Sequence, residues 1–139
     1  MMEIETYESL CDDALKIRIT VFVDEQGFKD EFDDIDEKAL HLVMYDGGKP
    51  VATCRCFYED SPECWHIGRV AVLKEYRGMG LGKHVMNEAE RRIKLKGGRV
   101  CELSSQCRAM RFYESCGYVA EGGIYLDEGC PHIKMTKQI

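Results

Sequence analysis

The sequence lacks any long apolar run. Among its 139 residues, no apolar segment approaches the roughly 20 residues that a membrane-spanning helix needs. Residues 1–5 also lack the basic and then apolar pattern of a secretory signal peptide. We therefore expect no membrane association, a cytoplasmic location, and a single domain that spans residues 1–139.

Positive charge is scarce as well. The chain has 19 Lys and Arg residues against 25 Asp and Glu residues, which gives a net charge of −6. Proteins that bind nucleic acids usually present a basic surface, so we expect no nucleic-acid partner. The chain has 8 cysteines, and without an export signal we expect them to be reduced thiols.

Complete metal-binding motifs are missing too. Cys54, Cys56, Cys64 and His66 lie close in sequence, but Cys54 and Cys56 alternate along an expected strand and do not form a C-x-x-C zinc knuckle. The acidic residues 29–38 lack the glycine and the final glutamate of an EF-hand loop. We expect no metal. The acidic segment is expected to be a solvated loop, or alternatively a negative rim that attracts a cationic substrate.

The most distinctive stretch covers residues 70–83, where an apolar strand leads through a glycine-rich turn into a helix. Gly78, Gly80 and Gly82 alternate, which lets backbone N–H groups approach an anion closely. The helix directs the positive end of its dipole to the same place, and Arg77 and Lys83 add full charges. These features predict a pyrophosphate-binding loop.

Two common phosphate-binding motifs fail on spacing. A P-loop needs Ser or Thr after its lysine, but Lys83 is followed by His84. The dinucleotide fingerprint G-x-G-x-x-G fits Gly78 and Gly80 but meets Lys83 at its third glycine. The pattern present is instead R-x-x-G-x-G, which begins at Arg77.

Hydrophobic periodicity predicts an α/β domain with a mixed sheet. The first helix is expected to run to about Phe22, with a capping box formed by Ser9 and Asp12. A strand–helix–strand connection around the helix after Gly80 predicts one parallel pair in a mostly antiparallel sheet. Strands are expected at 2–7, 40–45, 51–58, 64–73, 100–104, 118–126 and 132–135, and a short helix at 106–116.

The strand order, the glycine loop and the segment Phe112-Tyr113-Glu114-Ser115-Cys116-Gly117-Tyr118 together resemble the GCN5-related N-acetyltransferase (GNAT) family over nearly the whole chain. Segments 21–26 and 103–106 and the Asp-rich stretch before His41 resemble its small bacterial ElaA- and YjcF-type subgroup. The resemblance implies a parallel strand pair that is splayed at a CoA site, with flanking helices. It also implies acetyl-CoA as cosubstrate, a small-molecule or peptide amine as acceptor, and a homodimer as a common assembly.

The family's cofactor positions carry over residue by residue. Val70, Ala71 and Val72 match the strand that binds the pantetheine arm, with the Val72 N–H facing the thioester carbonyl. Gln106 stands where the family usually has Asn, and Lys74 stands where many members have Pro. The pyrophosphate loop corresponds to Arg77, Gly78, Met79, Gly80, Leu81 and Gly82, with the cofactor-binding residue Lys83 beside it.

Acetyl transfer from a thioester needs an acid for the leaving thiolate and a base for the amine. By its helix alone Tyr113 is expected to be a core residue, but the motif match favours its role as the family's acid. For the base we expect Glu25 first, then His41, with Glu102 or a water molecule as open alternatives. The family mechanism implies direct transfer to a primary amine, without a covalent enzyme intermediate.

Two other functions remain open from the sequence. The domain could bind CoA as a sensor or interaction module without catalysis. It could also transfer a different acyl group or use a different acceptor, such as a hydroxyl group.

Overall fold

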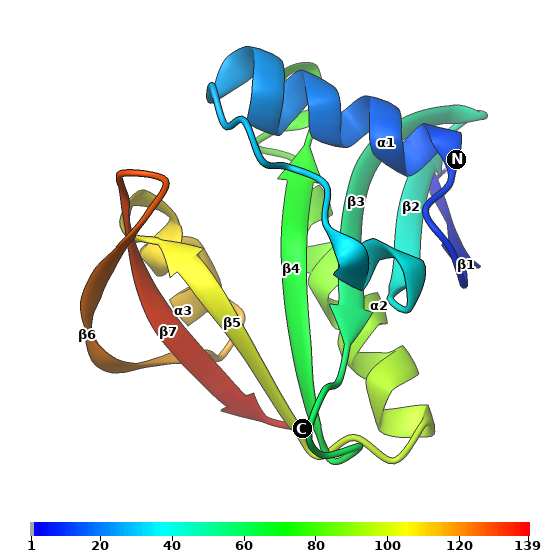
Figure 1. The fold of residues 1–139 in the computed structure, drawn as a ribbon. Helices are drawn as coiled ribbons and strands as arrows, with labels where there is room; N and C mark the ends of the chain where they lie inside the picture. Colours follow the sequence, from blue (N-terminus) through cyan, green and yellow to red (C-terminus); the bar gives the residue numbers. More distant parts are fainter. Residues whose placement is uncertain (1) are drawn as a thin grey trace.

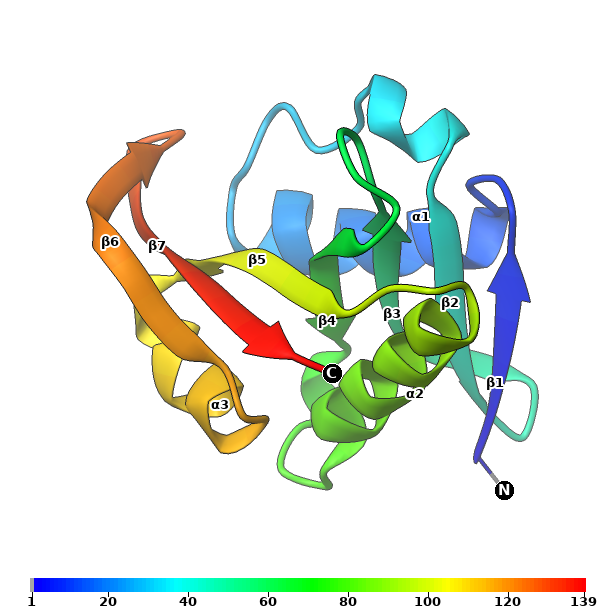
Figure 2. The ribbon, with the colours of Figure 1, turned by 90° about the horizontal axis from the view of Figure 1, so that it is seen from below.

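The computed structural model describes residues 2–139, which form a seven-stranded sheet with helices on both faces (Figures 1 and 2). Its strand order is β1-β2-β3-β4-β5-β7-β6, and within these residues only β4 and β5 pair in parallel. This confirms the predicted mixed sheet. The strands are β1 (Met2–Tyr7), β2 (Leu40–Asp46), β3 (Lys49–Phe57), β4 (Cys64–Val72), β5 (Val100–Gln106), β6 (Val119–Asp127) and β7 (Cys130–Gln138).

Helices α1 and α2 lie on opposite faces of this sheet (Figure 2). The α-helices are α1 (Asp12–Arg18), α2 (Leu81–Leu95) and α3 (Met110–Ser115). Three 3₁₀ turns (Asp34–Glu37, Lys74–Tyr76 and Cys107–Ala109) and one π-helix (Ile19–Glu25) complete the helical segments. No helix in residues 2–139 is both long and apolar enough to cross a membrane.

The first helical segment differs from its prediction at both ends. Cys11, rather than Ser9, is the N-cap of α1, and no side chain caps it, so the predicted capping box is wrong. After Arg18 the helix continues as the π-helix Ile19–Glu25, and Gly27 follows it with a φ of 79°. Since π-helical turns are rare and often occur at functional sites, this distortion directs attention to Gln26 at its end.

The predicted spacing of α2 is confirmed by its packing. Leu81, Val85, Ala89 and Ile93 are all buried, and they join the larger core against β2 to β5. The recurrence of these residues every fourth position places them on one helical face. This packing fixes the start of α2, and with it the glycine loop, against the end of β4.

Strands β4 and β5 separate soon after they begin. They pair only from Cys64 and Val100 to His66 and Glu102. Beyond that point β5 leans away from β4 and carries β7 and β6 with it (Figure 1). The last two thirds of β4 therefore have no strand partner on the side of β5. This is the splayed pair that the family resemblance implied.

A β-bulge lies on β4 beside this gap. The pairing of β3 with β4 shifts register between Thr53 and Arg55, and Arg69 has a φ of 52°. In a regular strand, Ile67 and Val70 would point to opposite faces of the sheet. The extra residue of the bulge lets both side chains contact the core on the α2 side. A positive φ is uncommon for an arginine, so its surroundings must stabilise it.

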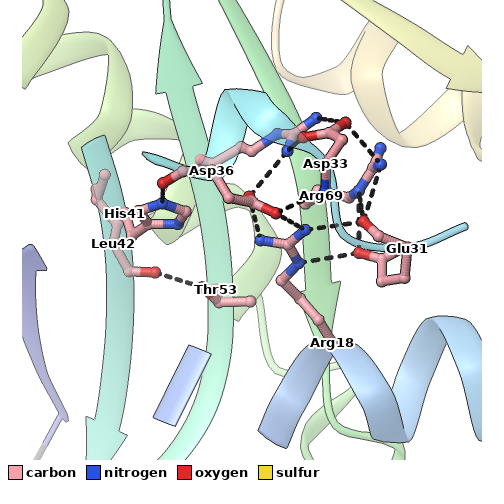
Figure 3. Close-up of polar contacts among 9 residues, drawn as sticks. Arg18, Glu31, Asp33, Asp36, His41, Leu42, Thr53 and Arg69 are labelled. Atoms are coloured by element: carbon pink, nitrogen blue, oxygen red, sulfur yellow. Dashed lines mark hydrogen bonds and ion pairs between the residues drawn. The ribbon is translucent and has the colours of Figure 1, made fainter. Parts of the chain in front are cut away.

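The acidic segment 29–38 is bound to the sheet, so its prediction as a solvated loop is wrong. Glu31 and Asp36 are only 4% and 5% exposed. Arg18 from α1 is itself buried and donates to the Glu31 carboxylate at 2.9 Å and to Asp36 at 2.7 and 3.1 Å (Figure 3).

Two further arginines complete this arginine–carboxylate network. Arg55 on β3 donates to Asp33 at 2.7 Å and to Asp36 at 2.8 Å. Arg69 donates to the Glu31 carbonyl at 3.1 Å and contacts its carboxylate at 2.9 Å, which holds the bulge in place (Figure 3). Burial by itself raises the pKa of Asp36, but the hydrogen bonds from Arg18 and Arg55 outweigh it and lower that pKa to about 2.

Candidate active site

A cavity of about 440 Å³ lies where the open edge of β4 meets the start of α2 and α3. We call it the cofactor pocket, and it brings together most of the residues predicted to bind acetyl-CoA. Met79 is the exception within the loop, since it is 59% exposed and does not line the cavity. The predicted residues that line it are Val70, Ala71, Val72, Arg77, Gly78, Gly80, Leu81, Gly82, Lys83 and Tyr113.

The glycine loop has the geometry that close approach of an anion requires. Gly78 and Gly80 have φ values of 79° and 77°, which disfavour any side chain. A Cβ on Gly82 would lie 3.0 Å from the Phe112 ring. Gly80 caps α2 without a side chain, and the first N–H that bonds back to it belongs to His84. The N–H groups of the first helical turn are thus left for a ligand.

The backbone of Val72 also faces the gap. The Leu73 N–H donates to the Val51 carbonyl at 2.9 Å, and bonds alternate along an antiparallel pair. Val72, paired with Ala52, is therefore a non-hydrogen-bonded position relative to β3. Its N–H points away from β3, toward the space that β5 has left. A thioester carbonyl in that space would meet this donor.

Arg77 joins the glycine loop to the end of the π-helix. Its Nε donates to the Val72 carbonyl at 2.9 Å, and its two terminal nitrogens each donate to Glu25 at 2.7 Å. The Arg77 hydrogen bonds lower the pKa of the Glu25 carboxyl, and Glu25 lines neither pocket. A lowered pKa makes a carboxylate a weaker base. Glu25 as the general base stays a prediction, and its geometry is that of an ion-pair partner.

A second cavity, of about 620 Å³, lies on the α1 side of the splayed strands. We call it the acceptor pocket. Gln26, Val70, Ala109 and Tyr113 line both pockets, so the two cavities meet at these side chains. A cosubstrate in one cavity and an acceptor in the other would come together at this junction.

Tyr113 is the titratable residue at the junction. Its ring packs edge-on against Phe112 and Tyr118, with ring centroids 5.0 and 6.2 Å away. Burial raises the pKa of Tyr113, so the phenol keeps its proton at neutral pH. Within residues 2–139 no side chain bonds its hydroxyl. Tyr113 is thus a packed residue that carries a protonated hydroxyl and lines both cavities.

Gln106 lies at the end of β5 and lines the acceptor pocket. Its Nε2 donates to the Oε1 of Gln26 at 2.8 Å, and its Oε1 accepts from Arg108 at 2.7 Å. This hydrogen bond between the two amide side chains connects the end of the π-helix to the end of β5. Gln26 was not singled out from the sequence, because its partner is 80 positions away.

The other two predicted base candidates lie outside both pockets. His41 is buried, with its Nε2 2.9 Å from the Asp36 carbonyl, and burial lowers its pKa. Glu102 contacts His66 at 3.1 Å and Lys134 at 3.4 Å, where β4 and β5 last pair. Both side chains have structural partners.

His132 also lines the acceptor pocket, and sequence reasoning missed it. It lies in the predicted last strand, where nothing in the local pattern distinguishes it. Only the pairing of β7 with β5 brings it beside Gln106. Among the described residues, no group of His, Cys, Asp or Glu side chains forms a candidate metal site.

Residues 5–118 match the acetyltransferase (GNAT) family. This chain is a member of that family. YjcF of Bacillus subtilis, named an uncharacterized N-acetyltransferase, is 35% identical, and the match covers 94% of each chain. The relatives named as acetyltransferases and the family match make the protein an acyltransferase.

Solved structures agree with this GNAT assignment. A proposed N-acetyltransferase from Lactobacillus plantarum has a TM-score of 0.90 at 33% identity, over 99% of this chain and 97% of its own. ElaA of Escherichia coli has a TM-score of 0.87 at 26% identity, over 99% of each chain. An acetyltransferase from Bacillus subtilis in complex with CoA shares the fold, with a TM-score of 0.78 at 16% identity over 100% of this chain and 99% of its own.

Proposed function

We propose that the protein is an acetyl-CoA-dependent N-acetyltransferase that transfers an acetyl group directly to a primary amine of a small molecule or peptide. The observation that supports this most is the position of Tyr113, at the junction of the cofactor and acceptor pockets. An acid at that junction can serve a leaving group in one pocket while a nucleophile attacks from the other.

In this proposal each part of the cofactor pocket has one task. The N–H groups of the glycine loop, together with Arg77 and Lys83, hold the pyrophosphate. The open edge of β4 from Val70 to Val72 bonds the pantetheine arm, and the Val72 N–H stabilises the oxyanion. Gln106 holds the end of β5 beside the cosubstrate through its hydrogen bond to Gln26.

The transfer itself needs no covalent enzyme intermediate. The neutral amine attacks the thioester carbonyl, the carbon–sulfur bond breaks, and Tyr113 donates its proton to the CoA thiolate. The raised pKa of the phenol keeps that proton available until the thiolate forms. The base stays as predicted from the sequence, with Glu25 first and His41, Glu102 or water as alternatives.

A CoA-binding sensor without catalysis is the second hypothesis. It explains the cofactor pocket but leaves Tyr113 at the junction without a task. The relatives named as acetyltransferases also favour the enzyme. Transfer of a longer acyl group would use the same residues and differ in the acyl-CoA that is accepted.

Free-thiol release tests this proposal, with acetyl-CoA and a panel of primary amines. We expect acetylated amine and free CoA in equal amounts, and a kcat about 100-fold lower for Tyr113→Phe with little change in KM. Tyr118→Phe is the matched control, because its hydroxyl bonds Glu90 outside both pockets. Binding of acetyl-CoA without any transfer would favour the sensor. An unchanged kcat in Tyr113→Phe would remove the acid role.

A further inference from the structure

We propose that the acceptor pocket takes an amine that carries a second positive charge, and that Nε2 of His132 is the base that removes the proton from the reacting amine. This inference rests on the proposed function. It adds the substrate class and a catalytic residue that the sequence did not reveal.

The hydrogen bond of His132 determines which ring nitrogen is basic. Nδ1 lies 2.8 Å from the carbonyl oxygen of Cys130. A carbonyl oxygen can only accept, so Nδ1 carries the proton and the neutral imidazole has its lone pair on Nε2. Within residues 2–139 nothing bonds Nε2. His132 is 6% exposed, so this lone pair belongs to a nearly buried side chain.

The ring of His132 is held in place on a second side. It stacks on Tyr125 of β6, with centroids 6.0 Å apart and planes at 27°. The Tyr125 hydroxyl is in turn hydrogen-bonded to Ser104 of β5. Three strands therefore fix the orientation of the imidazole before any ligand arrives, which is what a catalytic base needs.

Strand alternation directs His132 into the acceptor pocket. Ile133 and Met135 contact the core on the α2 side of the sheet, so His132 projects from the opposite face of β7. Its Cα partner on β5 is Gln106, which also lines the acceptor pocket. Tyr113 lines the same cavity, so the base and the acid face one space.

The charges around the acceptor pocket favour a cation. Glu31 and Asp33 are neutralised by the arginine–carboxylate network. Asp30 and Asp127 pair with no cation within residues 2–139, and Glu128 accepts only a backbone N–H there. The charged groups that line the cavity with His132 are Asp30, Glu31, Asp33, Arg69, Arg108, Asp127 and Glu128. Three unneutralised carboxylates outnumber the guanidinium of Arg108, which bonds the neutral amide of Gln106, so the cavity is negative.

The proton balance closes without another reactant. The ammonium of the acceptor gives one proton to Nε2 of His132, and the neutral amine forms its bond to the thioester carbon. The second proton leaves the nitrogen through water as the carbon–sulfur bond breaks. Tyr113 protonates the thiolate and regains a proton from water, while His132 releases its proton to solvent. The net reaction releases one proton.

The base role is tested with His132→Gln, assayed for thiol release on an amine that the wild type acetylates. We expect kcat to fall about 100-fold or more with unchanged affinity for acetyl-CoA, and the acidic limb of the kcat/KM profile to disappear. Added imidazole should restore part of the activity to His132→Ala. His84→Gln is the matched control, since His84 is exposed on α2 and lines neither pocket.

A kcat for His132→Gln within about threefold of wild type would overturn the base role. A pH profile that keeps its acidic limb would do so as well. If the wild type acetylates no amine although it binds acetyl-CoA, the proposed function fails, and the base role fails with it.

The substrate class is tested with three amines of equal length, namely 1,4-diaminobutane, 4-aminobutan-1-ol and 4-aminobutanoate. They differ only in the positive, neutral or negative group at the far end. We expect kcat/KM to fall about tenfold at each step in that order, and Asp127→Asn to reduce the advantage of the diamine. Asp34→Asn is the control, because it removes an exposed charge outside the pocket. Equal use of the three amines would overturn the cationic class.

Discussion

The two cavities that meet at Tyr113 are built in different ways. Most residues that line the cofactor pocket come from one continuous stretch, residues 70–83, which holds the open strand edge and the glycine loop. The acceptor pocket is lined by residues from separate parts of the chain, from the π-helix Ile19–Glu25 to β7, and a buried ion network lies at one of its walls. In the proposed function, the cosubstrate is therefore bound by one local stretch of the chain, whereas the acceptor is selected by side chains from distant elements, most of which do not line the cofactor pocket.

The largest expected effect comes from Arg18→Met, which removes an arginine of the buried ion network at the wall of the acceptor pocket and leaves the glycine loop intact. Glu31 and Asp36 would stay buried without their main partner, and removing one member of a buried ion pair costs about 3–5 kcal/mol. Urea unfolding measures this loss. Lys38→Met is the control, since its pair with Glu59 is 3.9 Å long and half exposed. Equal stability of the two variants would show that the network does not hold the wall.

Gly82→Glu is expected to break only the cofactor side. Its side chain would meet the Phe112 ring and add a negative charge beside the pyrophosphate loop. We expect acetyl-CoA affinity to fall about 100-fold, or ~2.7 kcal/mol, measured by calorimetry. Gly123→Glu is the matched control, because a Cβ there meets nothing within 4 Å. Unchanged affinity in Gly82→Glu would place the cosubstrate elsewhere.

Acid should weaken the arginine–carboxylate network beside the acceptor pocket. The pKa of Asp36 is about 2 in the folded chain, below the unfolded value of about 3.9. Ionised Asp36 therefore contributes fully to the free energy of unfolding above pH 4. This contribution, about 2 kcal/mol, is lost as the pH falls toward 2. Urea unfolding between pH 5 and 2.5 measures the slope. Asp36→Asn should lack this part of the slope, and an identical slope would contradict the assignment.

The smallest expected effect is that of Glu25→Gln, which separates an ion-pair partner from a base. If Glu25 only holds Arg77, its loss frees the guanidinium for the pyrophosphate. Acetyl-CoA affinity should then change by no more than about threefold, and kcat should stay near that of the wild type. A kcat drop of about 100-fold would instead restore Glu25 as the base.

The difference between the pockets also explains what the sequence could predict. Arg77 to Lys83 are contiguous, and the order of their glycines reflects backbone requirements that act locally. Strand and helix periodicity likewise depends on nearby residues, so α2 and the mixed sheet were predicted. The splay followed from the resemblance to the family.

The acceptor side could not be predicted in this way. Residues 29–38 were expected to be solvated because their charges stand alone in sequence, and Arg18 is 13 and 18 positions from its partners. Gln26 meets Gln106 only through the fold, and His132 reaches the site only because β7 inserts between β5 and β6. Contacts of this range depend on topology, which local patterns do not encode.

A crystal structure with acetyl-CoA tests the central claim most directly. We predict the thioester sulfur within hydrogen-bond distance of the Tyr113 hydroxyl, and the thioester carbonyl on the Val72 N–H. The acetyl group should face the acceptor pocket on the side of His132. A thioester remote from Tyr113, or one that points away from the junction of the two pockets, would contradict the account.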